Sequence, residues 1–139
     1  MERKVANMCN IFMSEEHEKN YNLLLKDFDS QTNGNWRIIY SNSRIAAFVY
    51  MMSSKNFLEL KNSILKCFDK NLQLKHLDKV DYLISSRCSG SQKVMVKLCL
   101  SFLHSTRDLE VPTLELFERL DNYNSTMCLN ALKIYFNIK

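Results

Sequence analysis

The fold is decided by the stretch Gly90-Ser-Gln-Lys-Val-Met-Val-Lys-Leu-Cys-Leu-Ser-Phe-Leu-His104. On a helical wheel its polar residues form one narrow stripe, and apolar side chains cover the remaining circumference. The stripe consists of Lys93, Lys97, Ser101 and His104. A helix that is apolar on most of its faces must be enclosed by other helices. The sequence therefore predicts a central buried helix near residues 90–106, with a thin polar stripe that stays accessible.

The composition of the whole chain favours an all-α protein. At 139 residues, of which 46% are apolar, the chain is long enough to bury a core and predicts a single helical domain over 1–139. Only two glycines and one proline occur, which suits helices with short connections. The net charge of +4 is mild, and no run of like charges reaches the length typical of a nucleic-acid site.

Helical spacing of apolar residues recurs on both sides of the central stretch and predicts a bundle of seven to eight helices. Beside the central one, the expected helices cover residues 3–12, 14–28, 36–52, 57–68, 72–86, a segment that begins at Pro112, and 127–138. A loop is expected over 29–35 and a short polar turn over 121–125, because both are rich in turn residues.

Two local patterns predict where helices begin. Ser14 followed by Glu15 and Glu16 is typical of a capping residue with an acidic first turn. Asn56, with Glu59 three residues later, has the pattern of a capping pair after the interruption at Ser53.

The residue types that carry enzyme chemistry do not gather in the sequence. The five cysteines are Cys9, Cys67, Cys88, Cys99 and Cys128; they are widely spaced and predict free thiols, with no metal site and no cofactor. The histidines, His17, His76 and His104, lie far apart and are expected to be ordinary surface or helix-end residues. No nucleotide-binding, esterase or zinc-protease motif occurs, so we expect no enzyme.

No segment of the sequence is expected to enter a membrane. The residues after Met1 lack the apolar core of a signal peptide, and the longest uncharged apolar run, Ile45 to Met52, is too short to span a bilayer. The sequence predicts a soluble chain.

The polar stripe on the central helix has two interpretations. It is either the solvated edge of a core helix, or it places the Lys93 cation at the rim of an apolar groove between helices. A groove of that kind binds an amphipathic partner helix, and a charge at the rim sets the orientation of the partner.

The two helices predicted over 72–106 resemble a unit of the Bcl-2 family of apoptosis regulators. In that family a central apolar helix begins at the motif Asn-Trp-Gly-Arg and follows a helix with apolar residues at the spacing of Leu77, Val80 and Ile84. Here Gly90-Ser-Gln-Lys93 stands in place of the motif, with Lys93 where the family has its arginine. Residues 36–52 and 57–68 take the places of two further groove helices. The absence of the Trp and of a C-terminal anchor resembles the divergent members found in large DNA viruses such as iridoviruses and poxviruses.

The resemblance implies a Bcl-2-like bundle that inhibits apoptosis by holding BH3-motif helices of pro-apoptotic relatives, such as Bim, Bak and Bax, in a hydrophobic groove. The residues that it places along the groove are Phe48, Met52, Phe57 and Leu60 on one wall, Val80 and Ile84 on the other, and Val96 and Leu100 on the floor. Gly90 and Lys93 lie at its rim, where Lys93 faces the acidic residue of the ligand. The implied location is the host cytoplasm or, through partners, the mitochondrial outer membrane surface.

Two other functions remain open at this stage. One is a viral immunomodulator of the same fold that has no groove and binds host signalling adaptors through its outer faces. The other is a helical scaffold or adaptor that self-associates. A homodimer is compatible with each of these, and an odd number of thiols offers one route to it.

Overall fold

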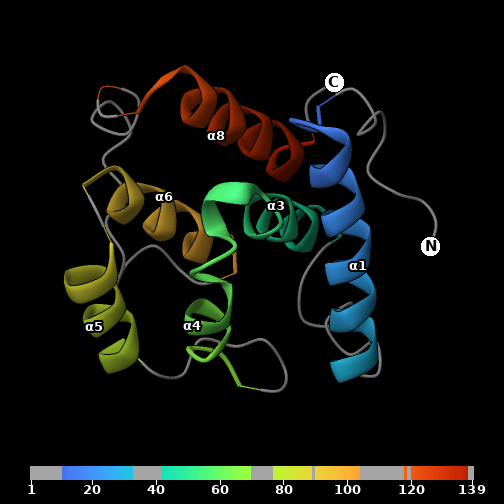
Figure 1. Cartoon of the computed structure of the whole chain (residues 1–139). Helices are drawn as coiled ribbons and strands as arrows, with labels where there is room; N and C mark the ends of the chain where they lie inside the picture. The colour runs from blue at the N-terminus through green and yellow to red at the C-terminus, as the bar shows by residue number, and fades with distance from the viewer. Residues whose placement is uncertain are drawn as a thin grey trace.

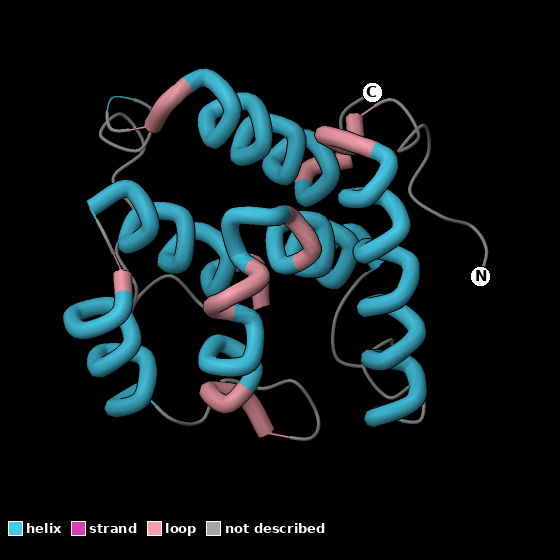
Figure 2. The backbone as a smooth tube through the Cα atoms, in the orientation of Figure 1, coloured by secondary structure: helices cyan, strands magenta, loops and turns pink. Residues whose placement is uncertain are grey.

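The computed structural model describes residues 11–32, 42–69, 77–88, 90–103, 118 and 120–137, and in this part of the chain it is all-helical. The helices are α1 (Glu15–Thr32), α3 (Asn42–Met52), α4 (Lys61–Leu65), α5 (Leu77–Arg87), α6 (Gly90–Ser101) and α8 (Asn122–Tyr135), with a short 3₁₀ helix, η2, at Lys55–Phe57. No described residue belongs to a β-strand (Figure 2). The predicted all-α class is therefore confirmed.

The helix enclosed by the others is α3, and the prediction that the helix near 90–106 occupies the centre is wrong in this respect. Every side chain from Ile45 to Met52 is at most 4% exposed. Figure 1 shows α3 between α1, α6 and α8, and α3 packs on all three. The physical reason is that Ile45–Met52 is an unbroken apolar run, whereas α6 carries a polar stripe that has to reach solvent.

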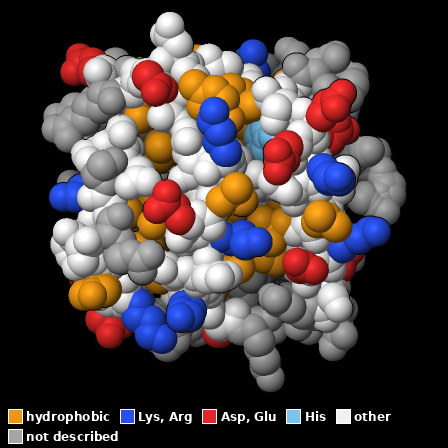
Figure 3. All heavy atoms as spheres, viewed as in Figure 1, with side chains coloured by type: hydrophobic (Ala, Val, Ile, Leu, Met, Phe, Trp, Pro, Cys, Tyr) orange, Lys and Arg blue, Asp and Glu red, His pale blue; other side chains and the backbone are white. Residues whose placement is uncertain are grey.

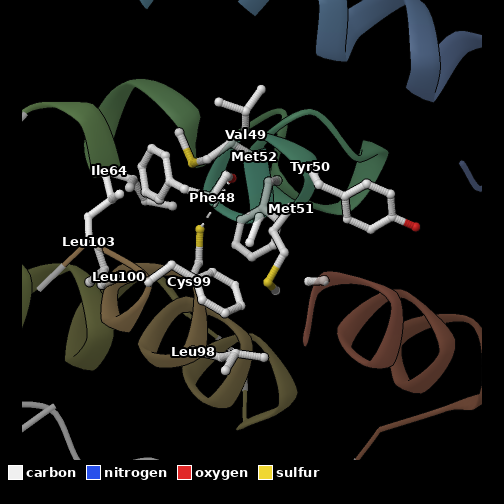
Figure 4. Close-up of a cluster of buried hydrophobic side chains, with 14 of the residues drawn as sticks. Phe48, Val49, Tyr50, Met51, Met52, Ile64, Leu98, Cys99, Leu100 and Leu103 are labelled. Carbon is white, nitrogen blue, oxygen red and sulfur yellow. Dashed lines mark hydrogen bonds between the residues drawn. The ribbon is translucent and has the colours of Figure 1, made fainter. Parts of the chain in front are cut away.

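Phe48 lies at the middle of the core that α3 organises. Its side chain is fully buried and lies beside two other rings, with centroids 6.0 Å from Phe28 of α1 and 5.6 Å from Phe68 after α4. On the α6 side, the Cys99 thiol points at the Phe48 carbonyl oxygen, 3.9 Å away (Figure 4). Buried side chains from all the described helices join this single cluster.

Helix α1 begins as the sequence predicts and ends later. The Ser14 hydroxyl accepts a hydrogen bond from the His17 backbone N–H at 3.1 Å, so Ser14 is the expected cap. The helix then continues to Thr32, through the first four residues of the expected loop over 29–35. The turn preference of Asp29, Ser30 and Thr32 is worth only a fraction of a kilocalorie each, too little to stop an established helix.

The helix expected over 57–68 is broken into shorter pieces. The 3₁₀ helix η2 is followed by turns and by the five-residue α4. Leu60 N–H donates to the Phe57 carbonyl and Ile64 N–H to that of Leu60, so all three side chains still enter the core. Apolar residues at positions i, i+3 and i+7 thus all face the core here, although the backbone consists of mixed turns and not of one helix. Asn56 does not cap this segment, because it lies inside η2; its side-chain amide instead donates to the Asn124 side-chain oxygen of α8.

Helix α8 begins earlier than expected, because residues 122–125 form its first turn and not a separate one. The Asp121 carboxylate accepts a hydrogen bond from Asn124 N–H at 2.8 Å and caps the helix. The side-chain-to-backbone bonding that makes such residues common in turns also makes them caps. At the other end, Asn137 takes a φ of 56°, a left-handed conformation that asparagine tolerates after a helix.

Helices α5 and α6 lie where the sequence predicts them, but α6, which begins at Gly90, ends at Ser101 and not near residue 106, because Phe102 and Leu103 form turns. Several expectations fall outside the described residues. These are residues 3–10 of the helix expected over 3–12, the part of the 36–52 helix before Asn42, the start of the 72–86 helix, most of the segment that begins at Pro112, and the residues Cys9, His76 and His104. The last two residues of the 3–12 helix, Ile11 and Phe12, are described and are not helical.

Candidate functional site

Most residues of the predicted groove are core residues. Seven of the ten residues are at most 2% exposed, and they come from α3, η2, α5, α6 and the turn before α4. These seven are Phe48, Met52, Phe57, Leu60, Val80, Val96 and Leu100. The structure brings them together in one cluster, but as packing partners of one another and not as the walls of an open cleft.

The three remaining residues reach the surface along α5 and α6. Ile84 is half-buried, whereas Gly90 and Lys93 are exposed. Gly90 and Lys93 belong to the accessible side of α6, together with Lys97 and Ser101, which are both partly exposed. We call these four residues the α6 stripe. The prediction that Lys93, Lys97 and Ser101 share one accessible face of this helix is confirmed.

The α6 stripe is basic and has no internal counter-charge. Lys93 and Lys97 lie one helical turn apart, and α6 contains no acidic residue. Among the described residues, neither ammonium group is within ion-pair distance of a carboxylate. The far end of α6 is anchored to α3, because Arg44 Nε donates a 2.7 Å hydrogen bond to the Phe102 carbonyl oxygen. The stripe is therefore a basic edge on a fixed helix.

A second constellation, which the sequence did not reveal, surrounds His17 at the carboxyl end of α3. His17 lies in the first turn of α1, which agrees with the expected helix-end position, but its side chain is 2% exposed and is therefore not on the surface. Its Nε2 lies 2.7 Å from the Tyr50 carbonyl oxygen, which also accepts from the Ser53 hydroxyl. The Ser54 hydroxyl donates to the Met51 carbonyl. The buried polar side chains His17, Ser53 and Ser54 thus all bond carbonyl groups at the end of α3; the Met51 carbonyl also accepts from the Ser54 backbone N–H.

The Tyr50 side chain ties this constellation to α8 and to the residues before α1. Its hydroxyl donates to the Ile11 carbonyl oxygen, which also accepts from Asn130 Nδ2 at 3.1 Å. Asn130 Nδ2 lies 3.2 Å from the Tyr50 hydroxyl oxygen as well. Burial raises the pKa of Tyr50 to about 12, so the phenol keeps its proton. The only signal in the sequence was a tyrosine inside an apolar run.

Three described thiols are buried and one is partly accessible. Cys67, Cys99 and Cys128 are fully buried, whereas Cys88 is half-exposed. Burial raises the pKa of the Cys128 thiol to about 12 and that of Cys99 well above its ordinary value, so neither is a nucleophile at neutral pH. Among the described residues, no three cysteine, histidine, aspartate or glutamate side chains are grouped so that they could hold a metal ion.

The surface carries side chains of both charges. On the face in Figure 3, basic and acidic side chains are interspersed and hydrophobic side chains lie between them. Among the described helices, none is both long and apolar enough to cross a bilayer. Comparison of the chain with protein-family models, with curated proteins and with solved structures found no match.

Proposed function

We propose that this protein is a non-enzymatic interaction module that binds an acidic amphipathic helix along the α6 stripe. The observation that carries the proposal is the pair of lysines, Lys93 and Lys97, which stand one turn apart without a carboxylate partner among the described residues. Basic groups at the edge of an apolar helix attract and orient an acidic ligand. Half-buried Val94 and Ile84 supply apolar contact area beside them.

The resemblance to Bcl-2 proteins suggests the identity of the partner. BH3-motif helices of pro-apoptotic proteins are amphipathic and carry an acidic residue, which Lys93 would face. The protein would then act as an inhibitor of apoptosis in the host cytoplasm. Because the seven groove residues are at most 2% exposed, such a helix either docks on the outer edge of α5 and α6 or separates these helices to reach Val96 and Leu100.

Calorimetric titration with a panel of BH3 peptides tests the proposal. Lys93→Glu should weaken binding by about 1–3 kcal/mol while leaving the free energy of unfolding nearly unchanged, because the side chain is exposed. Lys26→Glu on α1 is the matched control, since it makes the same change of charge at another exposed lysine. Equal affinities for the wild type and Lys93→Glu would refute the assignment.

The methyl resonances of Val96 and Leu100 distinguish the two modes of docking. Both side chains are fully buried in the free protein. Large shifts of these resonances on addition of peptide indicate that the helices separate and admit the ligand to the core. Shifts confined to Val94 and Ile84 indicate docking on the outer edge.

The closed core favours a second candidate, binding of host signalling adaptors through the outer faces without any groove. Leu129 of α8 is 48% exposed, and Phe136, which directly follows this helix, is 62% exposed; both are large apolar side chains on the outside of the bundle. A folded protein that binds none of the BH3 peptides would support this function. Glutamate at both positions should then abolish adaptor binding, whereas Leu23→Glu, at an exposed leucine of α1, should not.

A further inference from the structure

The His17 imidazole joins three parts of the chain through its two ring nitrogens. Nδ1 accepts a hydrogen bond from the Met13 backbone N–H at 3.1 Å, just before α1. Nε2 lies 2.7 Å from the Tyr50 carbonyl oxygen at the end of α3. The ring is bordered by Phe12 and Tyr50, at centroid distances of 5.4 Å and 4.5 Å. One titratable side chain therefore links residues 11–13 to α1 and α3.

These two bonds define the protonation state of His17. An amide N–H can only donate, so Nδ1 must present a lone pair to Met13. A carbonyl oxygen can only accept, so Nε2 must carry the proton that it donates to Tyr50. The contacts are thus compatible with one neutral tautomer. A second proton on Nδ1 would set two donors against each other and break the bond to Met13.

The surroundings of His17 offer little to stabilise its cation. Among the described residues, the groups in contact with the imidazole are the Met13 amide, the Phe12 ring, and the ring and carbonyl of Tyr50. Helix α8 contributes Asn130, Tyr123 and Cys128 beside Tyr50, and none of these groups is charged at neutral pH. The acidic residues of the first turn of α1, Glu15, Glu16 and Glu18, are exposed. His17 also lies in this first turn, where the helix dipole disfavours a cation.

One group favours the protonated form of His17, but its effect on the pKa is smaller than that of burial. The Tyr50 carbonyl at the carboxyl end of α3 favours a positive charge on Nε2. Burial outweighs it and lowers the pKa of His17 below the ordinary value of 6.5.

We propose that His17 is a proton-sensitive latch, which holds residues 11–13 against α3 and α8 while neutral and releases them when it is protonated. Release breaks the Met13 bond, and it frees Ile11, whose carbonyl oxygen is held by Tyr50 and Asn130. Phe12 packs on the rings of Tyr21 and Tyr50, so its departure uncovers an apolar aromatic surface. The inference does not depend on the function proposed for the α6 stripe.

The size of the effect follows from proton linkage. In the released state His17 is solvated and titrates near its ordinary pKa of 6.5, whereas the closed state, which is defined by the bond from Met13 N–H to Nδ1, requires the neutral imidazole. Above pH 7 the opening equilibrium is therefore independent of pH. At pH 5 the released state is favoured by a further factor of roughly 30, because about 1.5 pH units separate the solution from that pKa.

Hydrogen exchange of the full chain tests the latch. The Met13 amide, corrected for intrinsic exchange, should gain a factor of roughly 30 in opening between pH 7.5 and pH 5. Amides inside α3, such as those of Val49 and Tyr50, should keep their protection. In His17→Gln, which keeps one donor and one acceptor but does not titrate, the Met13 amide should show no such change.

Two results would overturn the proposal. An equal increase at Met13 and throughout α3 would mean that acid unfolds the whole protein. An unchanged Met13 amide at pH 5 would mean that His17 does not control the segment. Should His17→Gln fail to fold, ¹H–¹⁵N correlations of the wild-type imidazole decide the point: the latch requires a proton on Nε2 at pH 7.5, and a proton on Nδ1 would exclude it.

Discussion

Truncation of Phe48 tests whether this residue belongs to the core, as its burial indicates, or lines a binding groove, as the sequence suggested. The ring is completely buried and contacts the rings of Phe28 and Phe68. Phe48→Ala removes a ring that the surrounding helices cannot replace, which costs about 3–5 kcal/mol for a core phenylalanine. Since a domain of this kind has a free energy of unfolding of about 5–15 kcal/mol, this loss is a large part of the total.

Urea unfolding followed by circular dichroism measures this loss. Leu23→Ala is the control, because Leu23 is 56% exposed and its truncation should change the free energy of unfolding by about 0.5 kcal/mol or less. Phe48→Leu should lose less than Phe48→Ala, because it leaves a smaller cavity, and it provides a folded variant if the alanine protein is too unstable.

A groove residue would behave differently. If Phe48 lined an open peptide site, its truncation would weaken peptide binding while costing about 1 kcal/mol or less of stability, as for surface side chains. A loss below about 1.5 kcal/mol in Phe48→Ala would therefore contradict its placement at the centre of the core.

Three further predictions concern the helix ends and the thiols. Asp121→Ala should lower the free energy of unfolding by about 0.5–2 kcal/mol in urea titrations through loss of the α8 cap, and Asp121→Asn, which retains a capping oxygen, should lose less. Tyr50→Phe should cost about 0.5–1.5 kcal/mol by the same assay, since Asn130 still satisfies the Ile11 carbonyl; a loss above 3 kcal/mol would disagree with this bonding. With a thiol reagent at pH 8 and mass spectrometry, Cys88 should be labelled before Cys99 and Cys128, whose raised pKa values keep them protonated; early labelling of Cys99 would contradict its burial.

Local sequence patterns were reliable for α1 and α6, but not over 57–68, where the apolar spacing of a helix belongs to mixed turns. They predicted the start of α6 at Gly90, the accessible side that contains Lys93, and the Ser14 cap of α1. These features depend on residues within one or two turns of each other, so the information is local.

The tertiary structure decided which helix is central and which apolar residues are accessible. Apolar periodicity shows that Phe48 and Val96 face inward, but not whether a groove separates them, because core and groove side chains have the same spacing. In the described part of the chain, α1, α6 and α8 pack on α3, and side chains of the other helices join the same buried cluster.

The chain by itself determined an all-α protein with a basic stripe on α6. The burial of His17 was decided by tertiary structure alone: the bond to Met13 spans only four residues, but the Tyr50 carbonyl lies 33 residues along the chain and reaches the imidazole only when α1 docks on α3. Such a site depends on contacts between distant parts of the chain, for which a sequence pattern carries no local signal.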